Sequence, residues 1–218
     1  MTLEIGMLAY PAITQLDLTA PYEIFHRIPG AKVRIVWKTT EPVRTEEGFA
    51  LLPDTTLDAC PPLDVVFVPG GFGQVQLMTD DAVLSFLRRQ AANARYVTSV
   101  CTGALVLGAA GLLADHAATT HWAYVDLLPL FGARHEKARV VRDRKLITAG
   151  GVTAGIDFAL VVASELAGEA VARRIQLGLE YDPAPPFGRG SPDVADPALV
   201  EEIRTRLRQR TEATAARA

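Results

Sequence analysis

The feature that most constrains this chain is a strand-like run that ends in a cysteine and passes at once into a helix-like run. Residues 96–100 (YVTSV) are good strand formers, and residues 104–113 (ALVLGAAGLL) are typical of a buried helix. Only Thr102 and Gly103 lie between Cys101 and the second run. We therefore expect Cys101 on a sharp strand-to-helix turn, which holds a side chain clear of the sheet.

The position of Cys101 favours a nucleophile. The first turn of a helix offers free backbone N–H groups and the positive end of the helix dipole, and both favour a thiolate over a thiol. The alternative is a buried cysteine that packs as a small hydrophobic residue, which is the commoner role of a free cysteine. Other parts of the chain bear on this choice.

Composition narrows the class of protein. A chain of 218 residues, with 49% hydrophobic and 22% charged residues, is expected to form one α/β domain with a sizeable core. The net charge of −3 and the lack of a basic run argue against a nucleic-acid partner. There is no signal-peptide pattern and no apolar run of about 18 residues, so we expect no membrane partner and a cytoplasmic location. The two cysteines, Cys60 and Cys101, form no disulfide framework, and no ligand-spaced cluster predicts a metal.

Strand-like and helix-like runs alternate along the chain. This alternation predicts a flavodoxin-like α/β sandwich with a mostly parallel central sheet and helices on both faces. Strands are expected at residues 3–10, 31–38, 64–69, 96–100, 139–142 and 146–148, with a hairpin within 43–56. Helices are expected within residues 14–27, 81–93, 104–113, 121–128, 156–166, 171–179 and about 197–213. We take residues 1–218 as a single domain that closes with this last, charged helix.

Two further groups are expected beside Cys101, because active sites of such sheets lie at the carboxyl ends of the strands. Gly70 and Gly71 follow a buried strand, and we interpret them as a backbone nest for an oxyanion or a water. Asp17 follows the first strand and is a candidate acid or base. The alternative for Asp17 is a simple helix N-cap.

Two other residues and one segment are assigned no definite catalytic role. His121 either assists Cys101 or is a capped, hydrogen-bonded histidine. The proline-rich run 181–188 is rigid and irregular, and its shape and aromatic residues would suit a pocket wall. Cys60 precedes two prolines in a loop, and we give it no role.

The chain resembles the ThiJ/PfpI superfamily of class I glutamine-amidotransferase-like proteins over nearly its whole length. The matching stretches are QLDLTAPYE (15–23), PGG (69–71), SVCTGA (99–104), TTHW (119–122), ITAGG (147–151) and YDPAPPF (181–187). The likeness is strongest to the branch that hydrates isocyanides. The resemblance implies a cysteine elbow, no metal or organic cofactor, and a homodimer.

Departures from the wider superfamily narrow the mechanism. Its peptidase-like, glyoxalase-like and deglycase-like branches generally carry a glutamate near the first strand, and many place a histidine directly after the nucleophile. Here the acid is Asp17 and the residue after Cys101 is Thr102. A threonine cannot take a proton from sulfur as an imidazole can, so Asp17 is the expected proton-transfer partner.

The resemblance thus implies that water adds to an isocyanide and gives an N-substituted formamide through a covalent thioimidate. Cys101, Asp17 and Thr102 are the expected catalytic residues. The expected substrate- or oxyanion-binding residues are Gly70, Gly71, Gly150 and Val152.

Two alternatives remain open for the activity. One is a cysteine-dependent glyoxalase or deglycase. The other is a redox or small-molecule sensor related to the domains at the front of AraC-type regulators. Those regulators need roughly 100 further residues for two helix-turn-helix units. Here residues 197–218 are expected to form one helix only.

Overall fold

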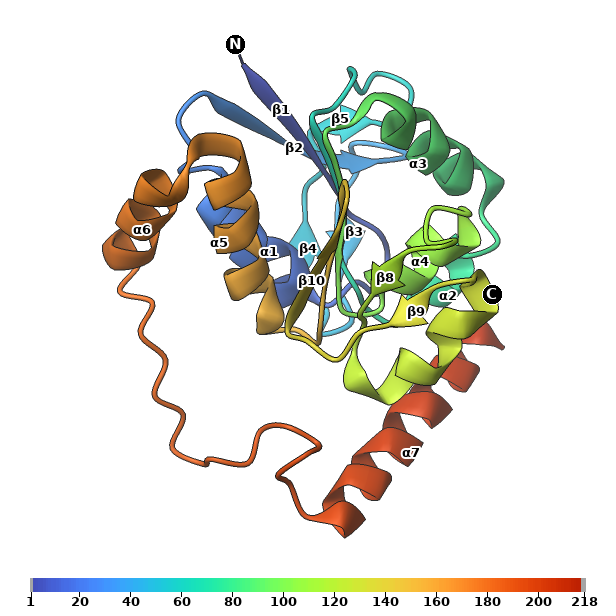
Figure 1. The fold of residues 1–218 in the computed structure, drawn as a ribbon. Coiled ribbons are helices and arrows are strands. Elements are labelled where there is room, and N and C mark those ends of the chain that lie inside the picture. Colours follow the sequence, from blue (N-terminus) through green and yellow to red (C-terminus); the bar gives the residue numbers. More distant parts are fainter. Residues whose placement is uncertain (1, 217–218) are drawn as a thin grey trace.

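A seven-stranded sheet forms the centre of the structure, a computed structural model that describes residues 2–216 (Figure 1). The strand order is β10-β11-β7-β6-β1-β2-β5. All neighbouring pairs are parallel except β10 and β11, which form an antiparallel hairpin. The expected flavodoxin-like sandwich with a mostly parallel sheet is confirmed.

The three middle strands are buried over most of their length because helices cover both faces of the sheet. They are β1 (Leu3–Leu8), β6 (Val65–Val68) and β7 (Tyr96–Val100). Helices α1 (Gln15–Phe25), α5 (Ala154–Ala167) and α6 (Glu169–Gly178) pack on one another at one face. Helices α2 (Gln74–Leu77), α3 (Asp81–Asn93) and α4 (Gly103–Ala109) lie at the other (Figure 1).

The remaining elements lie at the edges of this sandwich. They are β2 (Ala31–Trp37), β3 (Val43–Arg44), β4 (Ala50–Leu51), β5 (Thr55–Thr56), β8 (Ala117–Ala118), the 3₁₀ helix η1 (Trp122–Phe131), β9 (Arg134–His135), β10 (Val140–Asp143), β11 (Leu146–Ala149) and α7 (Pro197–Ala215). The expected hairpin within 43–56 is β3 and β4, but the end of that stretch, β5, pairs with β2 and extends the main sheet. Among the described residues, no helix is both long and apolar enough to cross a membrane.

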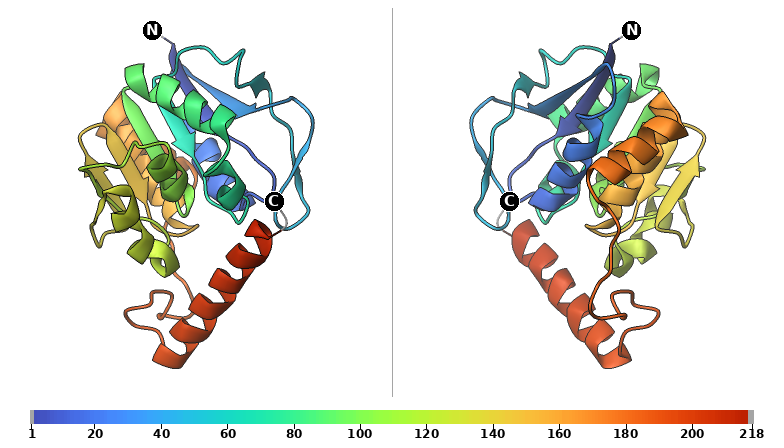
Figure 2. Two further views of the ribbon diagram at one scale, coloured as in Figure 1. Left: turned by 90° about the vertical axis from the view of Figure 1, so that its right-hand side faces the viewer. Right: turned by 90° about the vertical axis from the view of Figure 1, so that its left-hand side faces the viewer.

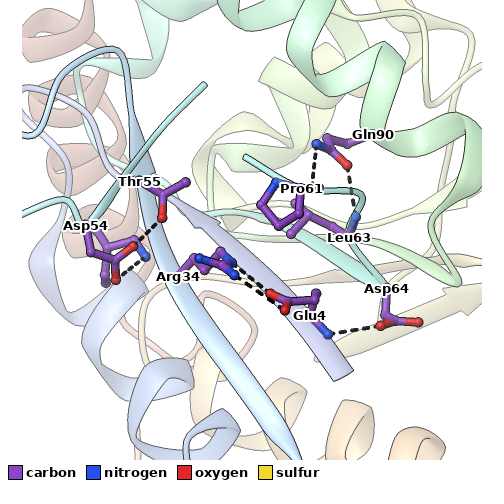
Figure 3. A network of polar contacts seen from close by, with 9 residues as sticks. Glu4, Arg34, Asp54, Thr55, Pro61, Leu63, Asp64 and Gln90 are labelled. Carbon is purple, nitrogen blue, oxygen red and sulfur yellow. Dashed lines mark hydrogen bonds and ion pairs between the residues drawn. The ribbon is translucent and has the colours of Figure 1, made fainter. Parts of the chain in front are cut away.

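Polar contacts tie the amino-terminal edge of the sheet together (Figure 3). The Arg34 guanidinium on β2 donates to the Glu4 carboxylate on β1 at 2.7 Å, and Glu4 N–H donates to the Asp64 carboxylate at 2.9 Å. Cys60 lies near this network, and burial raises the pKa of its thiol to about 11. Cys60 therefore lies at the amino-terminal edge of the sheet, whereas the site is expected at the carboxyl edge.

Helix α7 is set apart from the sandwich. It follows an irregular, mostly exposed segment at 181–196 and then crosses near the carboxyl edge of the sheet (Figure 2). Its first turn contains Pro197, and the Asp196 side chain accepts a hydrogen bond from the Ala198 N–H at 2.8 Å. Such an N-cap satisfies a backbone donor that the helix itself leaves free.

Candidate functional site

The carboxyl ends of β1, β6 and β7 bring the expected catalytic groups together. Cys101 follows β7 directly, and Gly70 lies two residues beyond β6. Asp17 lies in the first turn of α1, after the loop that leaves β1. A Cβ atom on Gly70 would lie 2.6 Å from Asp17 Oδ2 and 2.8 Å from Cys101 Cβ, so only glycine fits between the two side chains.

The backbone of Cys101 has the conformation expected of an elbow. Its φ of 55° is in the left-handed region that residues other than glycine seldom adopt. Its N–H donates to the carbonyls of Ala149 at 3.1 Å and Gly150 at 2.9 Å, and its own carbonyl accepts from the Thr120 hydroxyl at 2.8 Å. These bonds from β11 and the loop before η1 hold the strained turn.

Burial is the main influence on the Cys101 thiol, and it raises the pKa well above the ordinary value. The nearby Asp17 carboxyl raises that pKa further, while hydrogen bonds from the Val152 and Thr102 N–H groups lower it. The expectation that a helix start would make a free thiolate is therefore only partly met. The N–H donors are present, but they do not outweigh desolvation.

Asp17 is not the helix cap. Thr14 occupies the N-cap position of α1, and Asp17 turns inward, where it is fully buried and its Oδ2 accepts from the Gly70 N–H at 2.9 Å. Burial raises the pKa of this carboxyl to about 7, against opposing hydrogen bonds from Cys101 and Gly70. A carboxyl with this pKa, in contact with a thiol, can exchange a proton with it near neutral pH.

The N–H groups of the expected oxyanion-binding glycines, Gly70, Gly71 and Gly150, already donate hydrogen bonds to other protein groups. Gly71 N–H donates to the Thr102 hydroxyl at 3.1 Å, as Gly70 N–H does to Asp17. Gly150 N–H donates to the Arg139 carbonyl at 3.0 Å. The N–H groups of Gly70 and Gly71 therefore hold Asp17 and Thr102, and the N–H donors that reach the sulfur are those of Val152 and Thr102.

A cavity of about 140 Å³ opens beside Cys101. Among the expected residues, Gly71, Cys101, Thr102 and Val152 line it, while Asp17 lies behind them. The lining also includes residues that the sequence did not single out: Thr14, Glu46, Phe72, Gln74 and Tyr124, with Leu207, Arg210 and Thr211 of α7.

The proline-rich run 181–188, which we expected as a pocket wall, does not line this cavity. None of residues 181–188 lines it, and Phe187 is 82% exposed. Helix α7 supplies the wall instead. The signal for α7 was the spacing of its half-buried positions, Ile203, Leu207 and Thr211, which lie on one face of a helix.

His121 lines the cavity as the cap of η1. Its Nδ1 accepts from the Ala123 N–H at 3.2 Å, so His121 is a hydrogen-bonded histidine, as one of the two expectations has it. Burial lowers the pKa of the imidazole to about 4, so the ring is neutral at neutral pH. Gly151 leaves room for this ring, because a Cβ atom there would lie 2.5 Å from His121 Cδ2.

Comparison with known proteins gives a consistent result. The DJ-1/PfpI family model matches residues 4–165. The chain is 57% identical over 218 residues to the isonitrile hydratase of Pseudomonas putida, covering 98% of this chain and 96% of that protein. A ThiJ/PfpI family protein from Pseudomonas syringae has a TM-score of 0.94 at 43% identity, with 99% of this chain and 90% of that one covered. Drosophila melanogaster DJ-1beta has a TM-score of 0.74 at 26% identity, with 83% and 98% covered.

Proposed function

The chain belongs to the DJ-1/PfpI family, and from this premise we propose that it hydrates isocyanides to N-substituted formamides. The observation that carries the proposal is a buried thiol in contact with a buried carboxyl whose pKa is about 7. The relative that matches nearly the whole chain is an isonitrile hydratase, which supports the same reaction. Cys101 is the nucleophile and Asp17 carries the proton.

The first half of the reaction forms a covalent bond to sulfur. With one proton shared by the pair, the Cys101 thiolate attacks the terminal carbon of R–N≡C while Asp17 delivers its proton to that carbon. The product is the thioimidate R–N=CH–S, and Asp17 is left as a carboxylate. The Val152 and Thr102 N–H groups hold the thiolate before attack, and they also hold the thiolate that leaves at the end.

The second half adds water. The Asp17 carboxylate takes a proton from water as the hydroxyl oxygen attacks the thioimidate carbon, and the proton passes to nitrogen. The tetrahedral adduct then collapses: its hydroxyl proton returns to Asp17, the C–S bond breaks, and R–NH–CHO departs. Gln74 supports this step, because it is 3% exposed at the cavity and its Oε1 accepts no hydrogen bond from residues 2–216. A buried carbonyl oxygen of this kind gains from a water donor.

The neutral His121 argues against the thiol–imidazole pair of other branches, because its Nδ1 is already a cap for the Ala123 N–H. Thr102 acts with its backbone N–H on the sulfur and with its hydroxyl on Gly71. Its hydroxyl also fixes the Gly70–Gly71 loop against the elbow.

We also infer the homodimer that the family resemblance implies. Val161 of α5 and Leu177 of α6 are 36% and 83% exposed and offer apolar contacts on one side of the molecule. Light scattering at micromolar protein tests this, and a monomer mass contradicts it.

The activity is tested by two product assays on the purified protein. One measures formamide formed from a simple alkyl or aryl isocyanide, and the other measures lactate formed from methylglyoxal. We expect catalytic formamide production that is lost in Cys101→Ala. Lactate production instead would favour a glyoxalase, and turnover of neither compound would favour a sensor.

A further inference from the structure

The cavity beside Cys101 is closed on one side by the last helix of the chain. Leu207, Arg210 and Thr211 of α7 line it together with Cys101. Helix α7 begins well beyond residue 165, where the match to the DJ-1/PfpI family model ends. This wall therefore lies outside the part of the chain that the family model matches.

Helix α7 is anchored on η1 at one side of the cavity. The Tyr124 hydroxyl donates to the Leu207 carbonyl at 3.1 Å and shares a hydrogen bond of 2.8 Å with the Thr211 hydroxyl. The Arg208 guanidinium reaches both oxygens of Asp126, at 2.9 and 2.8 Å. These contacts fix the rotation of α7, so that Leu207 faces inward.

A second anchor holds α7 through Arg210. The Arg210 guanidinium lies 4.0 Å from the centre of the Phe72 ring and 3.9 Å from Glu46 Oε2. Glu46 in turn accepts a hydrogen bond from the Thr14 hydroxyl at 2.8 Å. The two anchors together hold the 207–211 stretch of α7 against the cavity, which Leu207 lines.

The shape of an isocyanide determines which part of the substrate meets this wall. The C–N–R atoms are collinear, so when the terminal carbon is at the sulfur, the R group extends straight away from Cys101 into the rest of the cavity. The apolar side chains there come from Phe72, Tyr124 and Leu207. The volume of about 140 Å³ is close to the ~150 Å³ of an engineered apolar cavity that holds benzene.

We propose that α7, through Leu207, determines which R groups the enzyme accepts. This inference rests on the proposed function for its substrate class. It makes Leu207 a specificity-determining residue, whereas Cys101 and Asp17 remain responsible for the chemistry. Leu207 suits such a test because no residue of α7 is fully buried, and Leu207 packs only partly buried against the hydrophobic core.

The test compares matched pairs of reagents in a Cys60→Ser background, so that Cys101 is the only thiol. The substrates are phenyl and 1-naphthyl isocyanide, and the readout is the ratio of their kcat/KM values. The parallel thiol reagents are N-phenyl- and N-(1-naphthyl)iodoacetamide, and the readout is the ratio of alkylation rates at Cys101. Leu207→Ala enlarges the cavity beside α7, and Leu207→Trp makes it smaller. Gln209→Ala, on the exposed side of α7, is the control.

We expect Leu207→Ala to raise both naphthyl-to-phenyl ratios by about tenfold or more, the usual effect of one or more methylenes in an apolar pocket. Leu207→Trp should lower them, and Gln209→Ala should leave them unchanged. If Leu207→Trp fails to fold, Leu207→Phe narrows the cavity at the same position with a smaller ring. Ratios that are equal in the Leu207 variants and in Gln209→Ala would overturn the inference. If the parent protein hydrates neither isocyanide, the proposed function fails, and the alkylation ratios still decide the role of α7.

Discussion

Burial acts against negative charge on both members of the Cys101–Asp17 pair. It raises the pKa of the thiol well above its usual value and the pKa of the carboxyl to about 7. The Val152 and Thr102 N–H groups and the Gly70 N–H compensate only partly. The pair therefore releases one proton near neutral pH and holds the second one tightly, which is the state that a proton-coupled attack by sulfur requires.

The two cysteines provide the first prediction. Cys101→Ala should abolish turnover and leave the fold intact, because it removes the nucleophile and little packing volume. Cys60→Ser should be nearly silent, because Cys60 lies at the opposite edge of the sheet near Arg34 and Glu4. Steady-state kinetics with circular dichroism checks both variants. A folded Cys60→Ser protein without activity would mean that the wrong thiol has been assigned.

Asp17→Asn separates a proton carrier from a structural acceptor. Asparagine can still accept from the Gly70 N–H, so a purely structural role predicts a small effect. A proton-transfer role predicts a loss on the order of 10²–10⁴ in rate. Normal rates in Asp17→Asn would remove Asp17 from the mechanism.

The pH dependence of kcat/KM tests the role of the Asp17 carboxyl independently. We expect kcat/KM of the wild type to rise through about pH 7, as the pair loses its first proton, and then to level off. The plateau should extend to high pH, because the second proton is held well above neutrality. The inflection near pH 7 should be missing from the residual activity of Asp17→Asn, and its persistence there would assign it to another group.

At the scale of elements, the start of α5 is coupled to the state of the thiol. Val152 has a φ of 21°, an unusual value for a β-branched residue, and its N–H bonds to Cys101. Helix α5 follows with Thr153 at its N-cap and no side-chain hydrogen bond there. This loosely capped start is thus held partly by the hydrogen bond to sulfur.

Alkylation or oxidation of Cys101 is therefore expected to shift the helix that begins near Val152. A thioimidate carries no negative charge, so the charge-assisted bond from Val152 weakens when the intermediate forms, and the shift would admit water. Crystal structures of the Cys60→Ser protein with free and with modified Cys101 provide the measurement. If residues 150–155 superpose within coordinate error, without raised B-factors, the glycines serve only packing, as Gly151 does against His121.

At the scale of the whole molecule, the buried Asp17 makes folding stability depend on pH. Its pKa is higher in the folded state than the ordinary value near 4, so between about pH 4 and 7 the folded protein binds a proton that the unfolded chain has lost. This contribution is present below pH 4 and is lost as pH rises through about 7. Relative to Asp17→Asn, the wild type should lose roughly 2 to 3 kcal/mol between pH 5 and 8.

Urea unfolding at the two pH values tests this expectation. Asp58→Asn is the matched control, because Asp58 is exposed and the same substitution there should not change the pH dependence. A wild type and an Asp17→Asn variant with parallel pH profiles would show that the folded carboxyl has an ordinary pKa.

The sequence by itself determined the sheet, the elbow and the edge at which the expected site residues meet. Strand and helix patterns are local, and the carboxyl ends of parallel strands must meet at one edge, so Cys101, Asp17 and Gly70 could be expected together. The prediction that Asp17, and not a histidine, is the proton-transfer partner likewise needed only the identity of the residue after Cys101.

Tertiary structure alone decided what depends on contacts between distant segments. It turned Asp17 inward to Gly70, left Thr14 as the helix cap and gave the glycine N–H groups to Asp17, Thr102 and Arg139. It also placed Leu207 of α7 on the cavity, where the sequence suggested the proline-rich run. The physical reason is that burial, and with it the pKa of a thiol or carboxyl, is set by what packs around a residue, and that packing is absent from the local pattern.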